Sequence, residues 1–205
     1  MNAKNPSFDL ILASASPRRA EILSQIGVLF TVIPAYIDES VLPNEDPQVY
    51  VRRVALAKAV AVSADSGPLT PVLAADTAVV IDSTILGKPT GIEHARSMLE
   101  LLSGRWHEVV SGVAIMHEDV SLISVRTRVK FRSILDHEIE AYWLSGEPAD
   151  KAGSYAIQGI GGAFVERIEG SYSNVVGLPM VETSTLLNKY SIAHALGSGA
   201  TRAQI

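Results

Sequence analysis

The sequence contains no cysteine among its 205 residues. This absence excludes disulfide bonds and thiolate metal sites, and it is compatible with a reducing compartment. The sequence also lacks an apolar stretch long enough to span a membrane, and residues 1–9 lack the basic-then-apolar order of a signal peptide. From these absences we expect a soluble, cytoplasmic protein that does not act at a membrane.

Positive charge is also scarce. The 17 Lys and Arg residues are outnumbered by 22 Asp and Glu residues, which gives a formal net charge of −5. General attraction to nucleic acid is therefore not expected, and an anionic ligand would need a local cluster of basic residues. The sequence has neither a G-x-x-x-x-G-K-[ST] motif nor a G-x-G-x-x-G motif after a strand, so a P-loop or dinucleotide fold is unsupported. Its five histidines show no metal-ligand spacing and do not indicate a zinc site.

Hydrophobic residues make up 47% of the chain, and their spacing alternates between strand and helix periods. Strands are predicted at residues 10–13, 29–33, 71–75, 78–81, 85–87, 106–116 and 120–131. Helices are predicted after the capping residues Ser16, Asp46, Thr90 and Asp136, and from Pro179. Residues 164–168 are expected to turn and return through 171–177, and a frayed tail is expected from residue 191. This length suits one large domain, or two small lobes around a continuous core.

The turn from Ser14 to Arg19 places positive charge at the start of a helix, where negative charge is favoured. Ser16 suits the N-cap and Pro17 the first helical position, so Arg18 and Arg19 lie in the first turn. Acidic residues are favoured there, because the helix dipole makes that end positive. An anion such as a phosphate chain, bound by backbone amides and two guanidinium groups, would remove the conflict. The alternative is that both arginines are solvated and point away from the turn.

Two acidic positions are candidates for binding a metal or a ligand. Glu39 follows Asp38 in a stretch without apolar periodicity, which is typical of a solvated loop but also supplies oxygen ligands for a divalent cation. Asp76 ends the buried strand predicted at 71–75. Ligands bind at the carboxyl ends of strands in open α/β sheets. A capping role is the alternative, although no helix is predicted directly after Asp76.

Three further polar residues have both a structural and a functional interpretation. Lys58 lies within a helix rich in alanine and valine, where a lysine either extends to the surface or reaches a phosphate. Lys88 is held between Gly87 and Pro89 at a hairpin exit, and it is either a surface residue or a partner for Asp76 or a phosphate. Gln158 lies in a glycine-rich stretch that allows close backbone approach to a ligand, and its amide suits a base edge or a ribose. The alternative is a bulged loop between strands.

A collinear set of motifs resembles the Maf family of nucleotide pyrophosphatases over residues 10–187. The matching segments are Ser14 to Arg19, Asp38-Glu39, Ala75-Asp76-Thr77, Gly87-Lys88-Pro89, Asp150-Lys151-Ala152-Gly153 and Tyr172-x-x-Val175-Val176-Gly177-Leu178-Pro179. The resemblance implies an α/β fold similar to the inosine-triphosphate pyrophosphatases, with an elongated mixed sheet flanked by helices and a cleft between two lobes. It thus implies one Maf-like domain over residues 1–205, with a core at 9–190 and tails at 1–8 and 191–205.

The resemblance also implies an activity and a set of site residues. The activity is hydrolysis of a nucleoside triphosphate to the monophosphate and pyrophosphate with Mg²⁺ or Mn²⁺, often by a homodimer. Arg18, Thr77 and Gln158 match the specificity residues of the branch that acts on dTTP and UTP. Among the matching motifs, the available donors to substrate are Ser14, Arg18, Arg19, Lys58 and Lys88. Glu39 and Asp76 are expected to hold the cation, with Asp76 as general base for the attacking water, although one of these two roles can belong to Glu39.

Two other functions remain open on the sequence. One is a house-cleaning pyrophosphatase for modified or non-canonical nucleotides, such as those with methylated bases. The other is a nucleotide-binding regulator of cell division without turnover, which the two retained acids disfavour.

Overall fold

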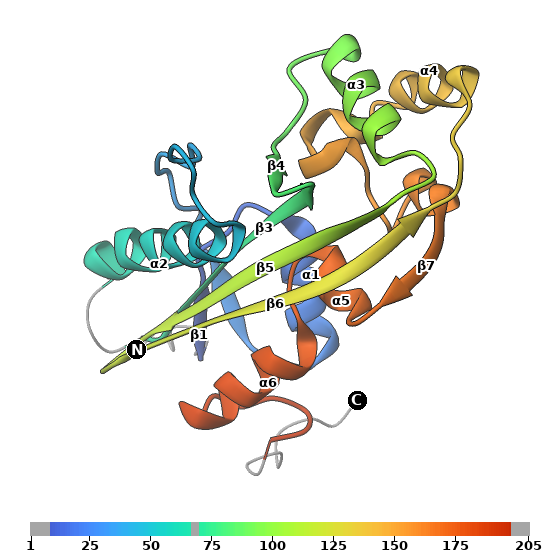
Figure 1. Ribbon diagram of the computed structural model, residues 1–205. Coiled ribbons are helices and arrows are strands. Elements are labelled where there is room, and N and C mark those ends of the chain that lie inside the picture. The colour runs from blue at the N-terminus through green and yellow to red at the C-terminus, as the bar shows by residue number, and fades with distance from the viewer. Residues whose placement is uncertain (1–8, 67–69, 198–205) are drawn as a thin grey trace.

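The structure is a computed structural model that describes residues 9–66 and 70–197 (Figure 1). Its centre is a seven-stranded mixed sheet in the order β2-β1-β3-β5-β6-β7, with β4 paired to β3. β1 is parallel to β2 and β3, and the other pairs are antiparallel. The strands are β1 (Leu10–Leu12), β2 (Phe30–Val32), β3 (Val72–Ile81), β4 (Thr84–Leu86), β5 (Trp106–Met116), β6 (Val120–Phe131) and β7 (Val165–Glu169).

Helices cover both faces of this sheet, which confirms the predicted mixed α/β class. They are α1 (Pro17–Gln25), α2 (Pro47–Ser66), α3 (Ile92–Leu102), α4 (Asp136–Leu144), α5 (Tyr172–Val176) and α6 (Met180–Lys189). Three short 3-10 turns are η1 (Glu147–Asp150), η2 (Ala152–Ser154) and η3 (Ile160–Phe164). Figure 1 shows α2 on one side of the long strands, α1 and α6 on the other, and α3 and α4 gathered at one end of β5 and β6.

Alternating side chains on the buried strands explain the two covered faces. Leu10 and Leu12 of β1 pack with residues of α1 and α6, whereas Ile11 and Ala13 pack with the alanine-rich side of α2. Because successive side chains on a strand point to opposite faces, a continuous apolar run is needed when both faces are buried. The predicted strands at 106–116 and 120–131 are confirmed, with the bounds of β5 and β6.

Asp76 lies in the middle of β3, so the prediction that it ends a strand is wrong. β3 continues to Ile81 because it pairs with β5 from Val72 to Val80. On its other edge, β1 pairs with β3 only as far as Leu73, and β4 begins its pairing at Val79. Residues 74–78 thus have a strand neighbour on one edge only, and this gap lies beside the turn that leads into α1.

Helix starts agree with the sequence where a side chain caps the backbone. Asp46 accepts from the amides of Gln48 and Val49 at 2.8 and 3.2 Å, as predicted for the start of α2. The predicted Thr90 cap is wrong, because α3 begins after Gly91 and Thr90 instead contacts His94. α4 begins at Asp136 itself, and the carboxylate of Glu138 accepts from the amide of the preceding residue, Leu135.

The segment after β7 also differs from the prediction. Most of residues 171–177 form α5 (Tyr172–Val176) instead of an extended return, because Ser171 Oγ accepts from the Asn174 amide and starts a helical turn. Residues 191–197, expected in a frayed tail, instead pack against the end of α1: Ile192 is buried and the Ala195 amide donates to Ile26 O at 2.8 Å. Residues 1–8 and 198–205, the rest of the predicted tails, lie outside the described residues.

No helix within residues 9–66 and 70–197 has the length and apolar character needed to cross a bilayer.

Candidate active site

A single cleft of about 660 Å³ brings together every residue that the sequence put forward for the site. Its lining includes Ser14, Arg18, Arg19, Glu39, Lys58, Asp76, Thr77, Lys88 and Gln158. The cleft opens at the gap along β3, where β1 has ended and β4 has not yet begun. The positive residues of the first turn of α1 therefore share one hollow with the two candidate acids.

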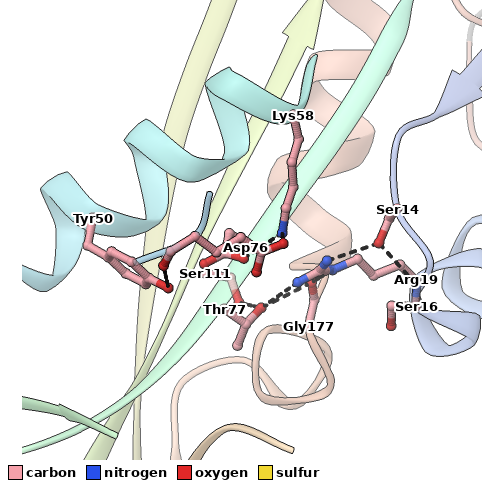
Figure 2. Close-up of polar contacts among 10 residues, drawn as sticks. Ser14, Ser16, Arg19, Tyr50, Lys58, Asp76, Thr77, Ser111 and Gly177 are labelled. Atoms are coloured by element: carbon pink, nitrogen blue, oxygen red, sulfur yellow. Dashed lines mark hydrogen bonds and ion pairs between the residues drawn. The ribbon is translucent and has the colours of Figure 1, made fainter. Parts of the chain in front are cut away.

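Arg19 is the most constrained of the basic residues (Figure 2). Its Nε donates to Gly177 O at 2.9 Å, one terminal nitrogen donates to Ser14 Oγ at 3.0 Å, and the other donates to Thr77 Oγ1 at 3.1 Å. The residue is 9% exposed, so the alternative that both arginines are solvated is wrong for Arg19. Its planar guanidinium group ties α1 to β3 and to the end of α5.

Arg18 differs from its neighbour although both lie in the first helical turn. It is only partly buried, and within the described residues its guanidinium group makes no hydrogen bond or ion pair. Ser16 and Pro17 occupy the predicted N-cap and first positions of α1, but the Ser16 side chain makes no capping bond. Instead, Ser14 Oγ accepts from the Ser16 amide at 3.2 Å. Arg18 is therefore the guanidinium group at this turn that is available to an anion.

Lys58 joins the two candidate acids. Its Nζ lies 2.8 Å from Asp76 Oδ1 and 3.0 Å from Glu39 Oε1. The side chains of Lys58 and Asp76 are each 8% exposed, which contradicts a surface position for Lys58, whereas that of Glu39 is 43% exposed. Burial raises the pKa of the Asp76 carboxyl, and the positive charges of Lys58 and Arg19 oppose that shift.

Neighbouring residues hold this acidic side of the cleft in place. The Tyr50 hydroxyl of α2 donates to Glu39 O at 3.0 Å, and Arg53 donates to Ser40 O at 2.9 Å. α2 itself lies directly on β5, because a Cβ added to Gly112 would stand 2.4 Å from Val51 O. The sequence does not indicate Tyr50, since an aromatic residue near the start of a helix rich in alanine and valine is indistinguishable from an ordinary core residue.

The far side of the cleft carries the remaining candidates. Lys88, which follows β4, and Gln158, which lies between η2 and η3, are both exposed and line the cleft. Thr77 faces Arg19 and lies 2.9 Å from Ser111 Oγ of β5. Tyr155 is buried beside them, and its hydroxyl shares a hydrogen bond of 2.9 Å with His107 Nε2.

The acids fit the needs of a divalent cation. Within the described ranges, no group of three or more His, Cys, Asp or Glu side chains could enclose a metal on its own. Mg²⁺ usually binds through one or two carboxylates together with substrate phosphates and water. Asp76 Oδ2 is buried and has no hydrogen-bond partner in the described part of the chain. Glu39 and Asp76 thus supply an oxygen donor set suited to a cation that arrives with a phosphate ligand.

The chain matches one known protein family over most of its length. The profile of the Maf-like protein family matches residues 9–190. The chain belongs to this family. The match contains every strand and helix of the fold and all residues of the cleft named above.

Similar proteins are found in several bacteria. A protein of Pseudoalteromonas atlantica named dTTP/UTP pyrophosphatase is 54% identical over 90% of this Maf-like chain and 98% of its own length. Proteins with the same name from Hahella chejuensis and Anaeromyxobacter dehalogenans are 50% and 52% identical, over 89% and 88% of this chain and 92% and 93% of their own. Among solved structures, the Ham1 protein of Staphylococcus aureus overlaps 60% of this chain and 71% of its own, with 12% identity and a TM-score of 0.44.

Proposed function

We propose that this protein hydrolyses dTTP and UTP to the nucleoside monophosphate and pyrophosphate with the help of a divalent cation. The observation that carries the proposal is the cleft itself, which gathers free positive groups, two acids and an exposed amide around one hollow. The name shared by relatives at 50–54% identity supports the choice of dTTP and UTP as substrates.

The basic residues suit a triphosphate chain. Arg18 and Lys88 line the cleft with their charged groups accessible, and the first turn of α1 adds backbone amides and the Ser14 hydroxyl. Phosphoryl transfer depends mainly on positioning and on neutralising charge at the phosphate oxygens. Arg19 holds the surrounding segments in place, because its nitrogen atoms donate to Ser14, Thr77 and Gly177.

The acids suit activation of water. Asp76 and Glu39 would hold Mg²⁺ or Mn²⁺, which supplies charge neutralisation at the phosphoanhydride oxygens. As the oxygen of the attacking water bonds to the α-phosphorus, Asp76 accepts a proton from that water. The bond from that phosphorus to the bridging oxygen breaks, and pyrophosphate leaves. Because burial raises the pKa of Asp76, its carboxylate is a better base than an exposed one.

We also propose that the protein is one domain with a core at residues 9–190, forms a homodimer and is located in the cytoplasm. The match of the family profile to residues 9–190 and the lack of cysteine support the first and the last.

A pyrophosphate-release assay tests the function. Purified protein with Mg²⁺ or Mn²⁺ is given canonical and base-methylated triphosphates, and we expect pyrophosphate from dTTP and UTP above all others. Asp76→Asn should bind UTP yet lose turnover by at least about 100-fold. Preference for methylated nucleotides would favour a house-cleaning role. Nucleotide binding by the wild type without any turnover would favour a regulator and reject the hydrolase.

A further inference from the structure

The loop that carries Gln158 is fixed from outside the cleft by one carboxylate. We call residues 156–162 the Gln158 loop. Glu147, at the start of η1, accepts from the Ile160 amide at 2.9 Å through Oε2 and from the Gly161 amide at 3.0 Å through Oε1. These amides lie two and three residues after Gln158. The carboxylate therefore binds the backbone directly behind the residue that lines the cleft.

Tyr142 holds the other end of the same loop. Its hydroxyl donates to Glu147 Oε1 at 2.7 Å and accepts from the Ala156 amide at 3.0 Å. The Tyr142 side chain is 2% exposed, whereas the Glu147 carboxylate that it contacts is only half-buried. Gln158 thus lies between two anchored points, Ala156 and Ile160, that are joined through one phenol and one carboxylate.

Packing shows that the loop backbone lies directly against these two side chains. A Cβ added to Gly159 would stand 2.0 Å from Glu147 Oε2, and one added to Gly161 would stand 2.5 Å from the Tyr142 hydroxyl. Both distances are far below normal contact, and neither glycine has a positive φ. Gly161 also lies against the backbone of Ala156, so a side chain there would displace the loop, whereas a side chain at position 159 would displace the Glu147 carboxylate.

Gln158 is the residue of this loop whose side chain points into the cleft. The preceding residue, Ile157, packs against the core beside α1 and α6 and against the core beside α3 and α4, so the next side chain points outward. Gln158 is exposed, lines the cleft and has no side-chain hydrogen bond within the described residues. Its carboxamide offers one acceptor and two donors, the groups needed to read the edge of a base. Glu147 and Tyr142 do not line the cleft.

We propose that Glu147, together with Tyr142, is a positioning residue that fixes the Gln158 carboxamide for recognition of the nucleotide base and so determines base selectivity. The inference rests on the proposed pyrophosphatase function and adds the residues that control its selectivity. Glu147 acts as an ionised acceptor: burial disfavours its charge, but bonds from Gly161, Tyr142 and Ile160 together hold its pKa below the usual value. A recognition group held by its supporting residues discriminates better than one on a loose loop.

Glu147→Gln tests the proposal, because its amide nitrogen would face a backbone donor and at least one anchoring bond would be lost. We expect kcat/KM for UTP to fall about tenfold, mainly through KM, as for the loss of one charge-assisted hydrogen bond. The UTP-to-CTP ratio of kcat/KM should fall by a similar factor while kcat changes little. Hydrogen exchange at the Ile160 and Gly161 amides should become faster. Glu140→Gln, on the exposed side of α4 and paired with Arg96, is the matched control and should change none of these quantities.

Two results would overturn the proposal. One is faster exchange in the loop with an unchanged UTP-to-CTP ratio, and the other is an equal loss of kcat for every nucleotide. If Glu147→Gln does not fold, Tyr142→Phe, which removes the bond to Ala156 and keeps the ring, is judged by the same ratio. If the wild type releases no pyrophosphate, the proposed function fails. The ratio of dissociation constants for UTP and CTP, measured in wild type and variant, then decides the role of Glu147 by itself.

Discussion

Lys58 Nζ lies within 3.0 Å of both Asp76 Oδ1 and Glu39 Oε1, so one ammonium group bridges the two acids of the cleft. The bridge is unequal, because the Asp76 side chain is 8% exposed and that of Glu39 is 43% exposed. Removing a partner from a buried ion pair leaves a charge without compensation, whereas an exposed charge is stabilised by water. Loss of the Lys58 ammonium group should therefore be costly at Asp76 and tolerated at Glu39.

Lys58→Met should destabilise the protein by about 3–5 kcal/mol at pH 8, because Asp76 is then buried without its ammonium partner. Asp76→Asn should have a smaller effect, since Lys58 keeps Glu39. Burial raises the folded-state pKa of Asp76. A raised pKa gives stability that is complete below the unfolded pKa and is lost as the pH rises. The Lys58→Met deficit should thus shrink at pH 5. Urea unfolding at both pH values measures it, and equal deficits in the two variants would contradict the account.

Arg19→Lys and Arg18→Lys should separate support of the cleft from contact with the ligand. A lysine cannot reach the three acceptors that the Arg19 guanidinium group holds at 2.9–3.1 Å. We expect Arg19→Lys to lose about 1.5–3 kcal/mol of stability. Arg18→Lys should stay within about 0.5 kcal/mol of wild type and raise KM for UTP. Chemical denaturation with steady-state kinetics measures both, and a similar loss of stability in the two variants would refute the distinction.

His107 should make the protein sensitive to acid. Burial lowers the pKa of His107 to about 3, so the folded state keeps it neutral. The unfolded chain binds its proton near pH 6.5. A lowered pKa gives stability that is complete above pH 6.5 and is lost as the pH falls toward 3, by up to about 1.4 kcal/mol per pH unit.

His107→Gln, which cannot gain that proton, should flatten the dependence of unfolding free energy on pH between 6.5 and 4. His137→Gln, at an exposed position on α4, is the control and should leave the slope unchanged. Guanidinium titrations at several pH values give the slopes. The same slope in both variants would show that His107 is not the acid-sensitive group.

The parts of the fold that the sequence predicted are those fixed by local signals. Asp46-Pro47 starts α2 because a carboxylate caps the backbone next to it, and the apolar alternation of β5 and β6 sets both strands. Asp76 was misplaced because only pairing with β5 shows that β3 continues through it. The pattern of nearby residues cannot predict this pairing, since the partner of Asp76, Gly112, lies more than 30 residues away.

The candidate residues were found through the resemblance and the charge conflict at α1, but their supporting residues were not. Glu147 and Tyr50 act through bonds to segments that only the fold brings near: the Gln158 loop and the backbone of Glu39. Neither residue breaks a local rule, so the sequence gives no reason to single it out. Arg18 and Arg19 do break one, so the sequence singles them out, but the difference in their burial depends on the fold.

The missing side chain at Gly112 has a consequence for how the cleft meets its ligand. With the backbone of α2 seated directly on β5, the helix that carries Lys58 and Tyr50 cannot shift without moving the sheet. The Lys58 ammonium group and Asp76 are therefore held in fixed relative positions before a nucleotide binds. Preorganised charges of this kind need no rearrangement during reaction. A bulkier residue at position 112 would push α2 away from β5 and lower turnover, although it would not contact any group that faces the nucleotide.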